Sequence, residues 1–169
     1  IESLKKANTE VLLLTDRIDE WLMTTLAEYS GKELVNAAKA DFDDAESKPK
    51  VSKDNEKLIE RIASKLKDEV AEVVVSSRLV DSAARLVTPK HDPGIQMRKI
   101  LESAGQKIPD SKPSLEVNLK HKLIKKLDTL EGREFTNFSK FLLDYATIAE
   151  GGSPKDPSKY LRQLDKFLI

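Results

Sequence analysis

The apolar side chains near the end of the chain are spread too widely for a helix that lies on one core. At about 100° per residue, a helix starting near Glu134 places the apolar side chains of residues 135–150 over an arc of roughly 220°. A helix packed on a single core needs little more than about 100°. A second helix, capped by Asp156 and beginning at Pro157, repeats the broad apolar face more weakly. This pattern predicts that the closing helices are buried on two sides.

Two arrangements could bury both sides of the longer helix. Within one domain it could lie at the centre of its own core, although only the short final helix follows in the sequence to cover the second face. Alternatively, two copies of the helix pair, related by a two-fold axis, could meet in a four-helix bundle. We favour this homodimer and expect its interface to consist of Phe135, Phe138, Leu142, Tyr145, Ile148, Ala149, Leu161, Leu164, Phe167 and Leu168.

The composition argues against several classes of partner. Lys plus Arg number 29 and Asp plus Glu number 29, so the net charge is zero and no overall field favours nucleic acid. There is no cysteine, and no uncharged run reaches the roughly 18 residues that a membrane span needs. We therefore expect no nucleic-acid partner, no membrane partner and no thiol chemistry.

Groups that could carry catalysis or bind a ligand are scarce. The histidines are His91 and His121, and the pair of His91 with Asp92 is better explained by a helix that Asp92 caps. The glycines of AEGGSP have neither the spacing nor the lysine of a P-loop. We expect no catalytic, cofactor-binding or metal-binding residue in this chain, and no enzyme activity.

The rest of the sequence predicts an α+β fold in which a small sheet packs with helices. Residues 10–15 form an apolar run that suits a strand buried on both faces, and a helix after Asp16 is expected to end at Gly31. The helical spacing of its apolar residues, Ile18, Trp21, Leu22, Leu26 and Tyr29, predicts that this helix packs next to the strand. Three further segments predict the strands of a three-stranded sheet, at residues 73–75, 84–88 and 114–118. Helices are predicted to pack with this sheet and to begin at Ser52 or Asp54, at Asp92 and after Asn118.

A charged segment separates two parts of the chain. Residues 41–57, DFDDAESKPKVSKDNEK, hold ten charged residues and a proline, so they bury too little apolar surface to order themselves. This composition predicts a linker between residues 1–40, a strand plus a helix, and a C-terminal unit of residues 58–169. Because Ile1 is not a native start, we expect the chain to begin inside a longer protein.

The helix after Asp92 carries an apolar stripe. Pro93 at its first position and Gly105 past its end mark about three turns. The stripe could pack on the small sheet, or it could face a partner, for which a flexible methionine is well suited. Its members are Met97, Ile100, Leu101 and Ala104.

Several segments resemble, in order along the chain, parts of the heat shock protein 90 chaperones, whose bacterial members are called HtpG. EVLLLTDRIDEWLMTTLAEYSGK is similar to the end of that family's middle domain. SSRLVDSAARLVT, SLEVN with the histidine after it, and LLDYATIAEGG with KDPSKYLRQLDKFL resemble successive parts of its C-terminal domain. The resemblance covers nearly the whole chain and fades in the linker.

The resemblance implies the end of the middle domain in residues 1–40 and the C-terminal dimerisation domain in residues 58–169 of an ATP-driven chaperone. ATP and Mg would bind in an N-terminal domain that this chain lacks, so no cofactor is expected here. The family uses this part to hold two protomers together, which makes the meeting of their N-terminal domains intramolecular. An oligomerisation or scaffold module without client binding is the alternative.

The resemblance also implies a surface for non-native client proteins. The matching helix of the family exposes apolar residues, which gives Met97, Ile100 and Leu101 in this sequence. Two positions depart from the relatives, since Pro93 stands where bacterial members often have methionine and Leu119 where they often have proline. The ending DKFLI lacks the acidic tail of eukaryotic cytosolic members, so we expect a bacterial or organellar type, located in the cytoplasm or an organellar matrix.

Overall fold

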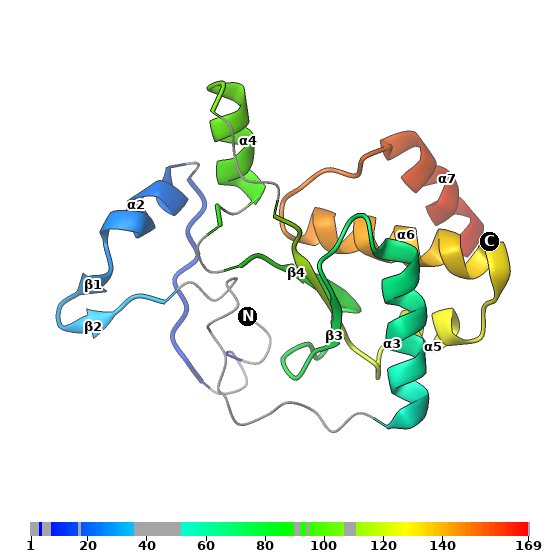
Figure 1. Ribbon diagram of the computed structural model, residues 1–169. Coiled ribbons are helices and arrows are strands. Elements are labelled where there is room, and N and C mark those ends of the chain that lie inside the picture. The colour runs from blue at the N-terminus through cyan, green and yellow to red at the C-terminus, as the bar shows by residue number, and fades with distance from the viewer. Residues whose placement is uncertain are drawn as a thin grey trace.

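The structure, a computed structural model, describes Leu4 and residues 8–16, 18–35, 52–89, 92–93, 95–106 and 111–168. Within these residues a small three-stranded sheet packs with helices, which confirms the predicted α+β class (Figure 1). The N-terminal elements are α2 (Asp19–Thr25), β1 (Glu28–Tyr29) and β2 (Lys32–Glu33). The later elements are α3 (Lys53–Leu66), β3 (Val73–Val75), β4 (Ala84–Val87), α4 (Ile95–Ser103), β5 (Ser114–Val117), α5 (Lys122–Asp128), α6 (Gly132–Ala149) and α7 (Pro157–Leu168).

The three strands predicted from the sequence form one sheet in the order β3-β5-β4. The central strand β5 runs parallel to β3 and antiparallel to β4. Leu115 and Val117 of β5 are fully buried in the core, whereas Glu116 between them points to the opposite face, as the two-residue repeat of a strand requires. The sheet therefore has one apolar face toward the helices and one face that carries charge.

Helix α6 lies at the centre of the C-terminal part of the molecule. It packs against β4, α3 and α5 on one side and against α7 on the other (Figure 1). The stripe predicted for α3 faces inward, because Leu58, Ile62 and Leu66 are buried. These side chains join those of the sheet, α5 and α6 in a continuous hydrophobic core.

Side-chain caps start two of the helices where the sequence predicts them. The Ser52 hydroxyl accepts a hydrogen bond from the backbone N–H of Asn55 at 3.4 Å before α3. The Asp156 carboxylate accepts one from the backbone N–H of Lys159 at 2.9 Å before α7. Both caps occupy helix donors that would otherwise have no partner in the first turn.

Helix α4 ends as predicted and begins slightly later. Gly105 has φ +74°, and the N–H of the next residue, Gln106, donates to the carbonyl of Leu101 at 3.0 Å. This is the hydrogen bond of a Schellman-type helix end. The helix itself starts at Ile95, two residues after the Pro93 start that the sequence predicts.

The prediction of a buried strand at residues 10–15 was wrong. These residues adopt no strand, and Leu12, Leu13 and Leu14 are 67%, 68% and 51% exposed. A short apolar run becomes a strand only when a neighbouring strand pairs with it. Among the described residues no such neighbour pairs with this run.

The helix predicted to end at Gly31 is shorter in the structure. Helix α2 ends at Thr25, and the following residues form the β1–β2 hairpin, with Tyr29 opposite Lys32. Ser30 and Gly31 lie between the strands with φ +50° and +75°. Positive φ at both central positions is what a tight two-residue hairpin turn requires. Gly31 is therefore a turn residue and does not end a helix.

The predicted linker overlaps the described residues only at its end. Helix α3 begins at Lys53, inside the range 41–57, and Ser52 is its cap. Residues 41–51 lie outside the described part of the chain. The division into residues 1–40 and 58–169 stays a prediction.

Candidate functional site

The core of a single chain accounts for most of the broad apolar arc of α6. Phe135, Phe138 and Leu142 are 2%, 0% and 0% exposed and belong to the hydrophobic core. On another side of the helix, Phe141 stacks on Tyr160 of α7, with ring centroids 5.2 Å apart and ring planes 9° from parallel. The width of the arc is thus explained largely without a second copy, and three residues predicted for the dimer interface are core residues of the single chain.

Other apolar side chains of the α6–α7 pair remain accessible. Ile148 is 41% exposed and Leu161 is 56% exposed. Ala149 is exposed as well, whereas Tyr145 and Leu164 are half-buried. These are therefore the residues of the pair that a second copy of the chain could contact. The two remaining residues predicted for the interface are Phe167 and Leu168, and the structure does not describe their side chains.

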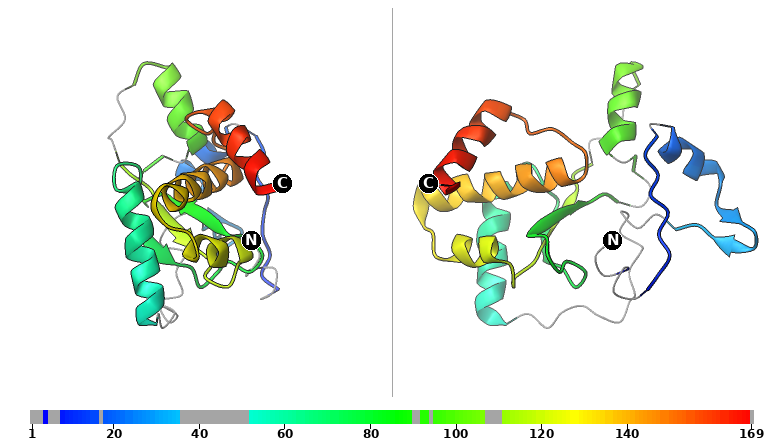
Figure 2. Two further views of the ribbon diagram at one scale, coloured as in Figure 1. Left: turned by 90° about the vertical axis from the view of Figure 1, so that its right-hand side faces the viewer. Right: turned by 180° about the vertical axis from the view of Figure 1, so that it is seen from behind.

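Helix α4 stands away from the three-stranded sheet (Figures 1 and 2). Ile100 is 39% exposed, and Met97 and Leu101 are half-buried. The Arg98 guanidinium donates a hydrogen bond to the Ser111 hydroxyl at 3.0 Å, which ties α4 to the segment that leads into β5. Ile100 is therefore accessible to a partner, whereas Met97 and Leu101 are partly covered within the chain.

The structure adds an exposed apolar face that the sequence reasoning missed. Ile18, Trp21 and Leu22 are 64%, 64% and 44% exposed on α2 and just before it. We call these three residues the α2 patch. The sequence shows them at helical spacing, which we interpreted as packing; only the tertiary structure leaves this face uncovered. In Figure 1 and in the right-hand view of Figure 2, helices α2 and α4 both lie on the side of the molecule away from α5 and α7.

A charged cluster occupies the face of the sheet that points away from the core. The Arg85 guanidinium binds Glu116 through two hydrogen bonds, at 2.7 and 3.2 Å, and Arg78 lies 3.8 Å from the same carboxylate. The Ser76 hydroxyl donates to it at 3.0 Å. Burial works to raise the pKa of Glu116, but the hydrogen bonds and charge of Arg85, helped by Ser76 and Arg78, hold it below its ordinary value. The cluster fixes the β3–β4 loop to the sheet.

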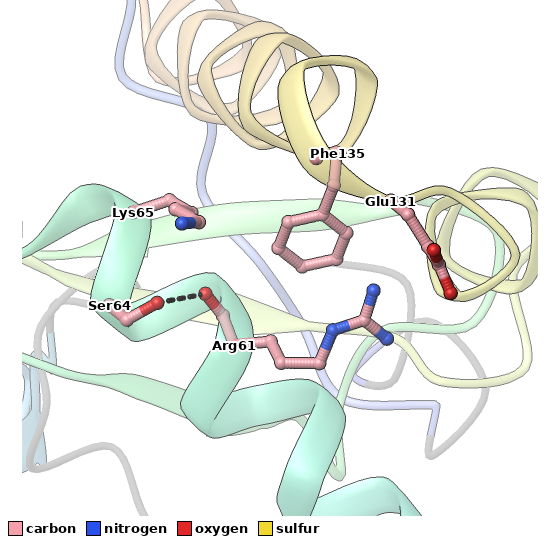
Figure 3. Close-up of a pocket in the computed structure, with 6 residues that line it drawn as sticks. Arg61, Ser64, Lys65, Glu131 and Phe135 are labelled. Atoms are coloured by element: carbon pink, nitrogen blue, oxygen red, sulfur yellow. Dashed lines mark hydrogen bonds between the residues drawn. The ribbon is translucent and has the colours of Figure 1, made fainter.

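A shallow opening of about 400 Å³ lies between α3 and the start of α6 (Figure 3). Arg61 lines it, with its guanidinium carbon 4.2 Å from the centroid of the Phe135 ring. The same guanidinium donates to the carbonyl of Leu130 at 2.7 Å and pairs with Asp128 at 3.4 Å. Arg61 is therefore a structural clamp. The opening is lined by Arg61, Ser64, Lys65, Glu131, Gly132 and Phe135, none of which is a histidine or a cysteine.

The histidine and carboxylate side chains of the described residues do not gather at one place. No three of their histidine, aspartate and glutamate side chains gather as metal ligands would. His121 accepts a hydrogen bond from the N–H of Leu123 at 3.1 Å and caps α5, while His91 lies outside the described residues. Across the same parts of the chain, no helix has both the length and the apolar character that crossing a bilayer demands. The exposed apolar side chains of α4, of the α6–α7 pair and of the α2 patch are the candidate site that remains.

A comparison with known protein families identifies the family to which the chain belongs. The chain matches the family described as Hsp90 protein over residues 1–169, its entire length. The match includes the α6–α7 pair, helix α4 and the α2 patch, and it agrees with the resemblance carried by the sequence motifs. This protein therefore belongs to the heat shock protein 90 family of molecular chaperones.

Proposed function

We propose that this part of the chaperone joins two protomers through α6 and α7. The observation that carries the proposal is the exposure of Ile148 and Leu161 after the single chain has formed its core. Isolated apolar residues are normal on a surface, but these two lie on a helix pair already held together by the Phe141–Tyr160 stack. A two-fold axis would set the same patch against itself, as in most homodimers.

The dimer is tested by light scattering of the chain over a dilution series. We expect the mass of two chains at high concentration, and Leu161→Glu to lower it toward one chain because the new charge would be buried at the interface. Lys166→Glu is the control, since this exposed residue lies on the same helix and its substitution changes the charge more. A wild-type chain that stays monomeric at every concentration would contradict the proposal.

We also propose that α4 and the α2 patch together bind non-native clients. Apolar surface that the fold leaves exposed, on elements that lie away from α5 and α7, supports this role. Met97 on α4 adds a flexible side chain that can adapt to different partners. The alternative is a scaffold whose only task is to dimerise.

Client binding is tested by fluorescence anisotropy with a carboxymethylated, permanently unfolded protein. We expect weak binding by the wild-type chain and several-fold weaker binding by Ile100→Ser, which removes exposed apolar surface from α4. Glu102→Gln on the same helix is the control, because this residue is exposed and polar. Binding that is absent in the wild-type chain would favour the scaffold.

We propose, finally, that this chain hydrolyses no ATP and that the protein is of the bacterial HtpG type, working in the cytoplasm. The family resemblance supports the first statement, because it implies that nucleotide binds in a domain outside this chain. Calorimetry with Mg-ATP is expected to give no heat of binding. Measurable hydrolysis by the purified chain would reverse the first statement.

A further inference from the structure

The α2 patch is a continuous apolar face. Ile18, Trp21 and Leu22 follow the i, i+3, i+4 spacing that places side chains on one side of a helix. All three are more than two-fifths exposed, although Ile and Leu are among the residue types most often buried and Trp is highly buried on average. An apolar face of this kind favours contact with another polypeptide.

The stretch of sequence that contains this patch is acidic. Residues 10–35 contain six acidic and two basic residues, a net charge of −4, whereas the whole chain is neutral. Asp16 and Asp19 are held at the start of α2 by local hydrogen bonds. The backbone N–H of Asp16 donates to the Asp19 carboxylate at 2.7 Å, and the Asp16 carboxylate accepts from the N–H of Ile18 at 3.3 Å. Two carboxylates thus lie beside the apolar face.

The hairpin after α2 adds a second acidic pair. Glu28 on β1 lies directly opposite Glu33 on β2, and both residues are exposed. Like charges in directly opposed positions destabilise a pair of strands. Among the residues that the structure describes, no cation forms an ion pair with either carboxylate. A positively charged partner would relieve this repulsion.

We propose that the α2 patch and its carboxylates select client segments that are apolar and positively charged, with Leu, Ile or Phe side chains flanked by Lys or Arg. This inference rests on the proposed client binding and adds the chemical class of the client. The apolar face supplies contact area, and the carboxylates favour cations beside it and disfavour acidic segments.

The single tryptophan of the chain makes the site directly observable. Trp21 lies in the patch, so its emission reports on contact at this place and nowhere else. The probes are three labelled peptides without tryptophan that share one apolar centre and carry flanks of lysine, serine or glutamate. We expect the lysine-flanked peptide to bind about tenfold tighter than the glutamate-flanked one at low salt, and to shift the Trp21 emission to shorter wavelength. The preference should shrink at 0.5 M salt.

Two matched triple variants distinguish the effect of these particular carboxylates on binding from the effect of the net charge of the chain. Asp16→Asn, Glu28→Gln and Glu33→Gln together should abolish the preference for lysine flanks, because the substitutions remove the charges and keep the hydrogen-bonding oxygens. The control is Glu56→Gln, Glu60→Gln and Asp68→Asn, three exposed residues on and just after α3 whose removal changes the net charge equally. The control should retain the preference.

Any other result of these experiments would contradict a specific part of the proposal. Equal affinity for all three peptides would mean that the carboxylates do not select, while client binding itself would stand. Binding without a change in Trp21 emission would place the site elsewhere. No binding of any peptide, or of unfolded protein, would remove the proposed client function as well. Loss of the dimer mass in Trp21→Ser would identify a second copy as the occupant.

Discussion

Tyr160 of α7 stacks on Phe141 of α6 with ring centroids 5.2 Å apart, and this contact joins the two helices within one chain. A second edge-to-face contact, between Phe138 and Phe141 at 5.8 Å, continues the aromatic packing along α6. The helix pair is thus one packed unit before any second protomer is present. Removing α7 altogether would expose Phe141, so point substitutions test the role of this pair more cleanly than truncation.

Replacing Tyr160 by Ala should lower the free energy of unfolding by about 2 kcal/mol, because it removes the stacked ring and opens a space over Phe141. Tyr160→Phe keeps the ring and should change the stability by less than about 0.5 kcal/mol. Urea denaturation followed by circular dichroism measures both. Equal losses in the two variants would show that the hydroxyl and not the stack is important.

Because the carboxylate of Glu116 is mostly buried and paired with arginine, removing its charge should lower the stability of the fold considerably. Glu116→Gln should lower the unfolding free energy by about 3 kcal/mol at pH 7, because Arg85 stays mostly buried but loses the charged carboxylate to which it donates two hydrogen bonds. Asp54→Asn is the control, since its pair with Lys57 is largely exposed and should contribute less than about 1 kcal/mol.

The pH dependence of this loss follows from the lowered pKa of Glu116. A carboxylate whose folded pKa lies below its unfolded value stabilises the protein above the unfolded value, and the contribution disappears as the pH falls through the folded one. The stability difference between wild type and Glu116→Gln should therefore be full above the ordinary value of 4.5 and shrink below it. A difference that grows on acidification would contradict this sign.

Asp144 on α6 should show the opposite dependence. Burial raises its pKa above the ordinary value of 3.8, and Asp156 and Glu69 add to the increase, against the opposing effect of Lys159 and Lys155. A raised folded pKa favours folding below 3.8, and this contribution is lost as the pH rises through the folded value. Asp144→Asn should thus gain stability relative to wild type between pH 4 and neutrality, as measured by thermal melts in matched buffers.

Arg61 should not be replaceable by lysine. Arg61→Lys keeps the charge but loses the planar fork that contacts Leu130, Asp128 and the Phe135 ring together. We expect the unfolding free energy to fall by about 1–2 kcal/mol. Lys65→Arg, at an exposed position one turn further along α3, is the matched control and should be nearly neutral. An unchanged stability in Arg61→Lys would show that charge alone suffices there.

Much of the C-terminal fold could be predicted because its signals are local. Ser52 and Asp156 cap helices by bonding to backbone groups three residues away, and Gly105 ends a helix because it adopts positive φ cheaply. The strand around Leu115 alternates buried and half-buried residues, so its face could be read from the order of the residues. These interactions join residues that are close in the sequence, so they can be predicted from the order of the residues alone.

Tertiary structure decided which apolar faces are covered. The run at Leu12 predicts a buried strand, yet its side chains are exposed because a strand depends on partners distant in the sequence. The arc of α6 suggests a dimer, yet Phe135 and Phe138 are buried within one chain because α3, the sheet and α7 converge on that helix. Amphipathic spacing predicts that one face of a helix will be buried. Only the tertiary structure determines which element covers that face, or whether any element does. The exposed Trp21 is the clearest consequence, since the same spacing that predicted packing instead presents a surface.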